Sequence, residues 1–366
     1  MKIAVLVSGG VDSSVALRLL LEEGHDVTAF YLKIWLEDEL SFLGECPWED
    51  DLSYVRAVCD QAHIPLEVVP FQKEYWERVV AYTIDEVKNG RTPNPDMLCN
   101  ARIKFGAFYE YLIYNRPARN TSVSEMGVGG FDKIATGHYA QVAEKNGKFF
   151  LKKTPDSIKD QTYFLSQLSQ KQLSRALFPI GKYEKKEVRK LAEKFSLMNA
   201  KRKDSQGICF LGKIPFNQFL KYHLGEQKGD LVNFETGEKV GEHSGFWYFT
   251  VGQRQGIGLS GGPFYVVKKD PQTNTIFIAS DRQKVLQSRD RFVIENANWF
   301  LEMPADGMKL SVKLRHGPKE YGCTLLKRDE YSFEVLLDEK DSGIAEGQFA
   351  VFYDGEMCLG GGAIKE

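Results

Sequence analysis

The sequence predicts an α/β domain with a doubly wound parallel sheet, then a small central domain, then a C-terminal antiparallel β-barrel. In the first half, short β-branched runs alternate with helical stripes, which is typical of a parallel sheet. After about Cys209, Gly and aromatic residues become dense, and from Arg291 onward short segments of alternating hydrophobicity dominate. We place the boundaries near residues 208 and 282, so the expected domains are 1–208, 209–282 and 283–366.

The elements of the first domain follow from local patterns. Ile3 to Val7 is a β-branched run suited to a buried central strand, and the apolar face of Val15 and Leu19 after it indicates a helix that stops at Gly24. Asn146-Gly147 predicts a two-residue hairpin turn. We expect further strands at 27–32, 66–69 and 133–136, helices over 52–59 and 75–87, hairpin strands at 139–143 and 149–152, and barrel strands that include 309–314, 333–337 and 350–353.

Composition limits the class of protein. The chain has 366 residues, of which 43% are hydrophobic and 27% are charged, so a mainly disordered chain is excluded. Its 48 Lys and Arg against 50 Asp and Glu give 48 − 50 = −2, which excludes a uniformly basic surface but leaves room for a local RNA-binding patch. Residues 182–203 contain nine Lys or Arg against three Glu, a cluster that attracts phosphate and that also fits the solvated face of a helix.

The sequence also bears on compartment. Its apolar runs fall short of the ~20 residues of a membrane helix, and its N-terminus enters a strand pattern without the features of a signal peptide. We therefore expect no membrane association and a cytoplasmic protein, or an organellar one if a transit peptide preceded this numbering. Six cysteines without a CxxC pair argue against a disulfide framework or a zinc knuckle.

Ser8 to Ser14, with the sequence SGGVDSS, lies between the first expected strand and the first expected helix. In this setting glycines let backbone N–H groups approach phosphate, and the helix N-terminus adds positive potential. The run lacks the Lys of a Walker motif and does not fit GxGxxG. It therefore predicts a phosphate site of another class, with a plain glycine turn at a capped helix start as the alternative.

This run resembles the PP-loop ATP pyrophosphatases, which have an adenine nucleotide alpha hydrolase-like fold and cleave ATP between its α- and β-phosphates. With TPNPDMLCN at 92–100, KDQTY at 159–163 and DSQGICF at 204–210, the chain resembles the tRNA-specific 2-thiouridylases, which replace O2 of the wobble uridine by sulfur. The resemblance implies that ATP, with Mg²⁺ expected beside its phosphates, is bound by Ser8, Gly9, Gly10, Val11, Asp12, Ser13, Ser14, Leu32 and Gly137.

A first cysteine motif spans residues 92–100, TPNPDMLCN. Asn94 and Asp96 can cap the following helix, and Cys99 falls in its first turn, where the helix dipole lowers a thiol pKa. From the residues alone, a buried small hydrophobe is the commoner role for such a cysteine. The resemblance implies that Cys99 is catalytic and that residues 94–96 contact the target base, and Asp96 is our candidate acid or base.

A second motif, DSQGICF at 204–210, delivers Cys209 on a polar, turn-rich stretch. The residues alone leave a reactive thiol and a core filler equally open, whereas the resemblance implies a persulfide carrier. Sulfur transfer needs one thiol to hold the sulfane and one to accept or resolve it, so a transient disulfide with Cys99 is one route. We expect the other four cysteines to be structural: Cys46, Cys59, Cys323 and Cys358.

The remaining motifs concern tRNA. TGHY at 136–139 follows an expected strand, KDQTY at 159–163 resembles a family element, and 313–316 with 347–353 match barrel segments. His316 stands where the family often has a phenol ring, which makes its assignment weaker. The resemblance implies tRNA contacts from Asn94, Pro95, Asp96, His138, Lys159, Asp160, Gln161, Arg315, His316 and Gln348.

Other functions stay open at this point. A PP-loop amide-forming ligase of the asparagine or argininosuccinate synthetase type would share SGGVDS but would not use Cys99 or Cys209. A non-catalytic RNA-binding protein would need only the basic segment and the barrel. Within thiolation, Asp96 with the two cysteines could instead hold an iron–sulfur cluster, which we favour less. The sulfur donor or relay protein, the tRNA species and the oligomeric state do not follow from the sequence.

Overall fold

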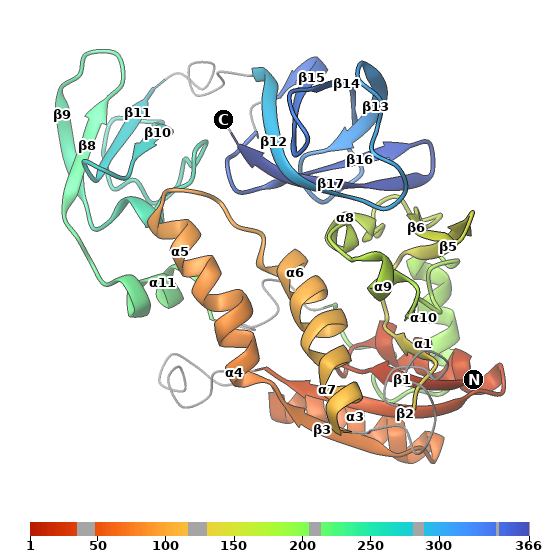
Figure 1. The fold of residues 1–366 in the computed structure, drawn as a ribbon. Coiled ribbons are helices and arrows are strands. Elements are labelled where there is room, and N and C mark those ends of the chain that lie inside the picture. The colour runs from red at the N-terminus through yellow and green to blue at the C-terminus, as the bar shows by residue number, and fades with distance from the viewer. Residues whose placement is uncertain (35–47, 116–129, 205–213, 281–288, 342–343, 366) are drawn as a thin grey trace.

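The computed structural model describes residues 1–34, 48–115, 130–204, 214–280, 289–341 and 344–365 (Figure 1). A five-stranded parallel sheet forms the first domain, in the order β3-β2-β1-β4-β7. The predicted parallel sheet is thus confirmed. Its strands are β1 (Lys2–Leu6), β2 (Asp26–Lys33), β3 (Leu66–Pro70), β4 (Lys133–Ala135) and β7 (Ala176–Leu177).

Helices cover both faces of this sheet. Successive apolar side chains of its central strand β1 point to opposite faces, so each face needs a layer of helices to bury them. Ile3 and Val5 of β1 belong to one apolar core, together with α1 (Val11–Glu22), α3 (Trp48–Ala62) and α10 (Lys185–Lys194). Ala4 and Leu6 belong to the other core. The helices of that second face are α4 (Gln72–Tyr75), η2 (Trp76–Val80) and α5 (Ala81–Lys88), followed by α6 (Pro95–Leu98), η3 (Cys99–Ala107) and α7 (Phe108–Asn115).

The predicted hairpin is present, and it has an unexpected partner. β5 (Gln141–Lys145) and β6 (Lys148–Lys152) are joined by Asn146 and Gly147, whose φ values of 53° and 75° suit a tight hairpin turn. β6 then pairs with β17 (Met357–Lys365) of the C-terminal domain. The first domain therefore contributes two strands to the sheet of the barrel.

That sheet has eight strands, and pairing of β12 with β17 closes its barrel. A separate apolar core fills the barrel. The predicted antiparallel barrel is confirmed. Its own strands are β12 (Arg289–Trp299), β13 (Met308–Lys313), β14 (Tyr321–Lys327), β15 (Ser332–Asp341), β16 (Phe349–Asp354) and β17.

The central domain has a small four-stranded sheet in the order β10-β11-β8-β9, with its own core. Along the described ranges, none of the helices combines the length and the apolarity needed to cross a bilayer. The elements of the central domain are α11 (Phe216–Leu224), β8 (Gly229–Asn233), β9 (Lys239–His243), η4 (Phe246–Tyr248), β10 (Tyr265–Asp270) and β11 (Thr275–Ala279). Two short helices of the first domain, α8 (Thr162–Leu165) and α9 (Gln170–Leu173), lie between the parallel sheet and the barrel.

Candidate active site

The SGGVDSS loop leaves β1 at the point where the strand order reverses. β2 lies on one side of β1 and β4 on the other, and ligands of open α/β sheets bind at such a switch point. Gly9 has a φ of +75°, and a Cβ on it would lie 2.6 Å from the Asp51 carbonyl oxygen. Helix α1 begins directly after Gly10, so its first N–H groups face this edge.

The loop after β4 packs against this helix start. A Cβ on Gly137 would lie 2.6 Å from the Ser13 nitrogen, so no side chain fits between the two loops. Leu32 lies near the carboxyl end of neighbouring β2. The predicted nucleotide residues therefore gather at one edge of the sheet, and glycines with an uncapped helix N-terminus fit the phosphates of ATP.

Lys185 supplies the cation that the loop sequence lacks. Its Nζ lies 2.7 and 2.8 Å from the two carboxylate oxygens of Asp12, and the Tyr139 hydroxyl donates to the same carboxylate at 2.9 Å. Burial and the nearby Asp12 charge raise the Tyr139 pKa, so the phenol stays protonated. The sequence does not single out Lys185, because a basic run such as 182–203 has the same pattern whether its charges face RNA or a nucleotide loop.

Two more residues from the end of that basic run hold the loop. Asn199 Nδ2 donates to the Gly9 carbonyl and to the Ser14 hydroxyl, both at 2.9 Å, and Arg202 donates to the Gly9 carbonyl at 3.0 Å. Arg202 also pairs with Asp51 on α3. The segment that leads toward Cys209 is thus fastened to the nucleotide loop.

Asp204, the last described residue before Cys209, forms ion pairs with three basic side chains. Its carboxylate lies 2.8 Å from Lys159, 2.8 Å from Lys185 and 2.6 Å from Arg189. Burial acts to raise the Asp204 pKa, but hydrogen bonds from Lys159 and Lys185 outweigh it and hold the pKa at about 2. Cys209 itself lies outside the described residues, so its meeting with Cys99 stays a prediction.

Cys99 lies on the long helix that starts at Pro95. Asn94 caps this helix as expected, because its Oδ1 accepts from the Met97 N–H at 3.1 Å. Asp96 lies in the first turn, and Cys99 follows just after that turn. The Cys99 side chain is buried, with 1% exposure, in the core on this face of the sheet.

TGHY links the nucleotide loop to this helix. Gly137 touches the loop, and His138 next to it is buried against Phe178, whose ring also contacts Phe105 of the Cys99 helix. Burial, together with the charge of Lys104 on that helix, lowers the His138 pKa well below its usual value. His138 is therefore neutral at pH 7 and hydrogen-bonded to Thr136 at 2.7 Å.

The first three residues of KDQTY bind protein groups in this structure. Lys159 pairs with Asp204, and Gln161 accepts from the Tyr139 N–H at 2.9 Å. Asp160 is 2% exposed and pairs with Lys313 of the barrel. Of the three, Asp160 is the one that solvent, and hence RNA, does not reach here.

The predicted barrel contacts lie where the barrel meets the first domain. Arg315 is exposed and pairs with Asp341 at 3.1 Å, and His316 stacks on Phe164 with ring centroids 4.8 Å apart. Gln348 is partly buried, in a turn whose Glu346 carbonyl accepts from the Thr92 N–H at 2.9 Å. That turn therefore adjoins the segment that leads to Cys99.

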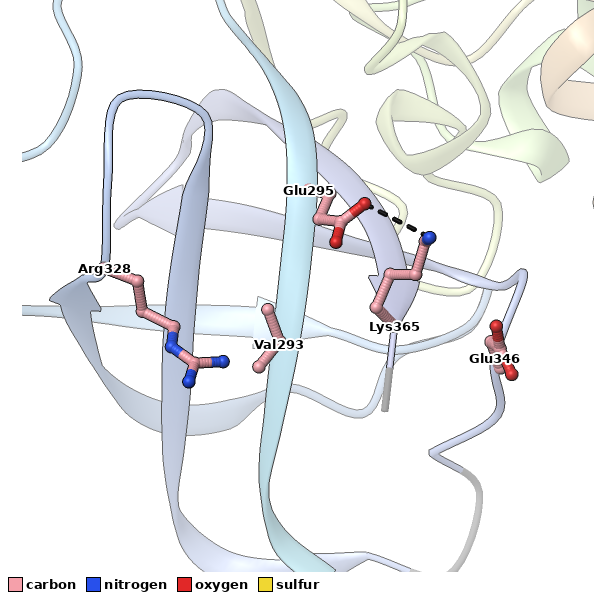
Figure 2. Close-up of a pocket in the computed structure, with 5 residues that line it drawn as sticks. All are labelled: Val293, Glu295, Arg328, Glu346 and Lys365. Atoms are coloured by element: carbon pink, nitrogen blue, oxygen red, sulfur yellow. Dashed lines mark ion pairs between the residues drawn. The ribbon is translucent and has the colours of Figure 1, made fainter.

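A groove on the outer side of the barrel borders the same turn. It is lined by Val293, Glu295, Arg328, Glu346 and Lys365, with Lys365 and Glu295 paired at 3.2 Å (Figure 2). Two cations and two carboxylates give it no net attraction for phosphate. We therefore place the site at the sheet edge and the domain junction. Within the described ranges, no group of three His, Cys, Asp or Glu side chains is arranged to hold a metal ion.

Fold and site together define a nucleotide-binding α/β protein of the PP-loop class, in which His138 and Phe178 connect the nucleotide loop to the helix of the buried thiol and the barrel packs against the first domain. Family models match three consecutive segments: the tRNA methyl transferase HUP domain at 1–213, the tRNA methyl transferase PRC-barrel domain at 217–280 and the aminomethyltransferase beta-barrel domain at 289–364.

The chain also matches curated relatives over its full length. The chain is 43% identical to the tRNA-specific 2-thiouridylase MnmA of Porphyromonas gingivalis, 43% to MnmA 1 of Bacteroides thetaiotaomicron and 44% to MnmA of Parabacteroides distasonis, with 100% of this chain and 99% of each relative covered. The chain belongs to the family of tRNA-specific 2-thiouridylases. A solved NMN synthetase from Francisella tularensis is 15% identical with a TM-score of 0.33 over 62% of this chain and 77% of that one, too low a similarity to support an argument.

A substitution at Gly137 tests the nucleotide edge. In Gly137→Ala the new Cβ meets backbone atoms of Ser13 and Asp12 within 2.8 Å, so we expect ATP affinity to fall roughly tenfold or more. Calorimetric ATP titration measures this. Gly24→Ala is the control: it has a φ of +78° with open space around it, so it loses about 1 kcal/mol of stability but keeps ATP affinity. Equal ATP affinity in both variants would contradict the assignment.

The Asp204 cluster predicts a pH dependence of stability. Because the folded-state pKa is lowered to about 2, the ionised carboxylate stabilises the fold above its unfolded pKa and loses this effect as the pH falls toward 2. Because the Asp204 side chain is 26% exposed, solvent screens part of this effect. We expect Asp204→Asn to lower the free energy of unfolding by about 1 kcal/mol at pH 7, with the gap to wild type closing between about pH 5 and pH 2. Urea unfolding across this range measures it, with exposed Glu193→Gln as control; a gap independent of pH would refute the cluster's role.

Proposed function

We propose that this protein catalyses ATP-dependent 2-thiolation of the wobble uridine in tRNA anticodons. The observation that carries the proposal is the position of residues 136–139, which touch the nucleotide loop through Gly137 and Tyr139 and adjoin the Cys99 helix through His138. The residues that follow β4 thus connect the nucleotide site to the helix that carries Cys99. An amide-forming ligase has no use for that pairing.

ATP supplies an adenylyl group that turns the uridine O2 into a leaving group. The residues that would hold it are the SGGVDSS loop, Leu32 and Gly137, with Lys185 as the neighbouring cation. Asp12 is the carboxylate at this loop that would meet an accompanying Mg²⁺. In the proposed reaction O2 attacks the α-phosphorus, pyrophosphate leaves, sulfur then bonds to C2, and AMP departs with the oxygen.

The sulfur comes from a persulfide on Cys209, loaded by a separate donor or relay protein. Its outer sulfur either attacks C2 directly, after which Cys99 attacks the Cys209 sulfur and frees the thiolated base, or leaves as sulfide when Cys99 attacks Cys209 and then bonds to C2. Both routes end in a Cys99–Cys209 disulfide, which an external dithiol must reduce before the next turnover. Asp96 is the candidate acid or base. The uridine must leave the anticodon stack, and because Cys99 is buried, the surrounding core must open for the base to reach it.

For tRNA we propose contacts along the junction of the first domain and the barrel, and the cytoplasm, where tRNA and ATP are found, as the compartment. Exposed lysines of 182–203, such as Lys186 and Lys194, add attraction for phosphate. The proposed contact residues are Asn94, Pro95, Asp96, His138, Lys159, Gln161, Arg315, His316 and Gln348. Pro95 and His138 are buried in this structure and, like Cys99, become accessible only when the surrounding core opens.

Cysteine replacement tests the chemistry. We expect Cys99→Ser and Cys209→Ser each to reduce 2-thiouridine formation at least a hundredfold, because the thiolate is the group that carries or resolves sulfur. Mass spectrometry of nucleosides from tRNA incubated with protein, ATP and a persulfide donor measures this. Cys59→Ala, a buried thiol in the other core, should retain activity. Thiolation that survives both serine variants would contradict the cysteine roles. Pyrophosphate release that survives both variants, with no 2-thiouridine formed by wild type, would favour the ligase class, and absence of pyrophosphate release in wild type would favour an RNA-binding protein.

A further inference from the structure

We propose that Asp160 and Lys313 act on thiolation as a positioning pair that fixes the barrel on the catalytic domain, and that neither side chain contacts tRNA. The inference rests on the function proposed above. Asp160 precedes α8 in the first domain, and Lys313 ends β13 of the barrel, 153 positions later. Lys313 Nζ lies 3.0 Å from Asp160 Oδ2.

Both side chains are removed from solvent. The side chain of Asp160 is 1% exposed and that of Lys313 is 3% exposed, and charges so deeply buried persist only where they are paired and hydrogen-bonded. Thr162 Oγ1 donates to the same Asp160 oxygen at 2.8 Å. Lys313 Nζ also lies 3.7 Å from Glu320 and 5.2 Å from the Tyr353 ring centroid. Protein groups thus surround the pair.

The pair is connected to the proposed RNA contacts of the barrel. The Asp160 carbonyl accepts from His316 Nε2 at 3.1 Å, so one residue binds both ends of the segment from Lys313 to His316. The His316 ring stacks on Phe164, with an angle of 24° between the ring planes. Asp160 therefore sets both the place of the strand end and the orientation of the ring.

Phe164, on which His316 stacks, also contacts the helix that carries Cys99. Asn100, the residue after Cys99, donates from Nδ2 to the Phe164 carbonyl at 3.2 Å. In the proposed reaction, a tRNA bound to the barrel must place its wobble uridine next to Cys99. Since a displacement of about 1 Å can cost about a hundredfold in rate, loss of the pair should slow chemistry more than it weakens binding.

Direct contact with tRNA is the competing role, and it predicts a different outcome. A lysine that neutralises one phosphate contributes about 0.9 to the slope of log affinity against log salt. If Lys313 made such a contact, its removal would weaken binding and flatten that slope. A positioning lysine leaves both unchanged.

The experiment compares Asp160→Asn and Lys313→Met with Lys309→Met, an exposed lysine on the same strand. Single-turnover thiolation is measured at saturating tRNA, and tRNA affinity is measured by filter binding over a range of salt. We expect the rate to fall about tenfold or more in both pair variants, with affinity changed less than about threefold and the slope unaltered. A slope reduced by about one for Lys313→Met, or a wild-type rate, would overturn the proposal.

The double variant Asp160→Asn/Lys313→Met completes the test. Because both charges are removed, neither partner is left buried without a counter-charge. The double variant can therefore be measured even if a single variant does not fold. We expect its rate to be no lower than that of the slower single variant, because the two residues act as one unit. Losses that multiply, or wild-type activity, would refute the pair. Wild-type protein that forms no 2-thiouridine would instead refute the proposed function.

Discussion

The site depends on how closely the loop after β4 approaches the loop after β1. Gly137 leaves no space for a side chain against Ser13, so the two loops meet backbone to backbone. Because β1 and β4 are neighbouring parallel strands, their carboxyl ends bring both loops to one edge. A wider gap would separate the nucleotide phosphates from His138 and the thiol helix, and the two halves of the proposed reaction would no longer share a site.

Charged side chains also shape the nucleotide site. The nucleotide loop has its own carboxylate, Asp12, and receives its cation from Lys185 on α10. Lys185 also binds Asp204, so one ammonium group bridges the nucleotide loop and the segment that leads to Cys209. Such charge-assisted hydrogen bonds are shorter and stronger than neutral ones, and three cations on one carboxylate restrict it more than a single exposed pair would.

Much of this was predictable from the sequence, because it is written in local patterns. The hairpin at Asn146-Gly147 follows from two residues that tolerate positive φ, and the switch-point site follows from SGGVDSS between a strand and a helix. The pairing of β6 with β17 is different in kind. It joins Leu151 to Cys358, and no local pattern encodes which distant strand edge a hairpin will meet. Burial of Asp160 was missed for the same reason, since its partner is 153 residues away.

The segment from Lys159 to Phe164 shows why a polar motif need not face its substrate. Successive residues there point to different neighbours: Lys159 to Asp204, Asp160 to the barrel, and Gln161 to the strand end at Tyr139. Each contact alone is a single hydrogen bond or ion pair. Together they connect one short stretch to three parts of the protein. A motif with this role has to keep its polar residues as strictly as a motif that touches RNA, so sequence pattern alone does not distinguish the two, whereas burial and partners do.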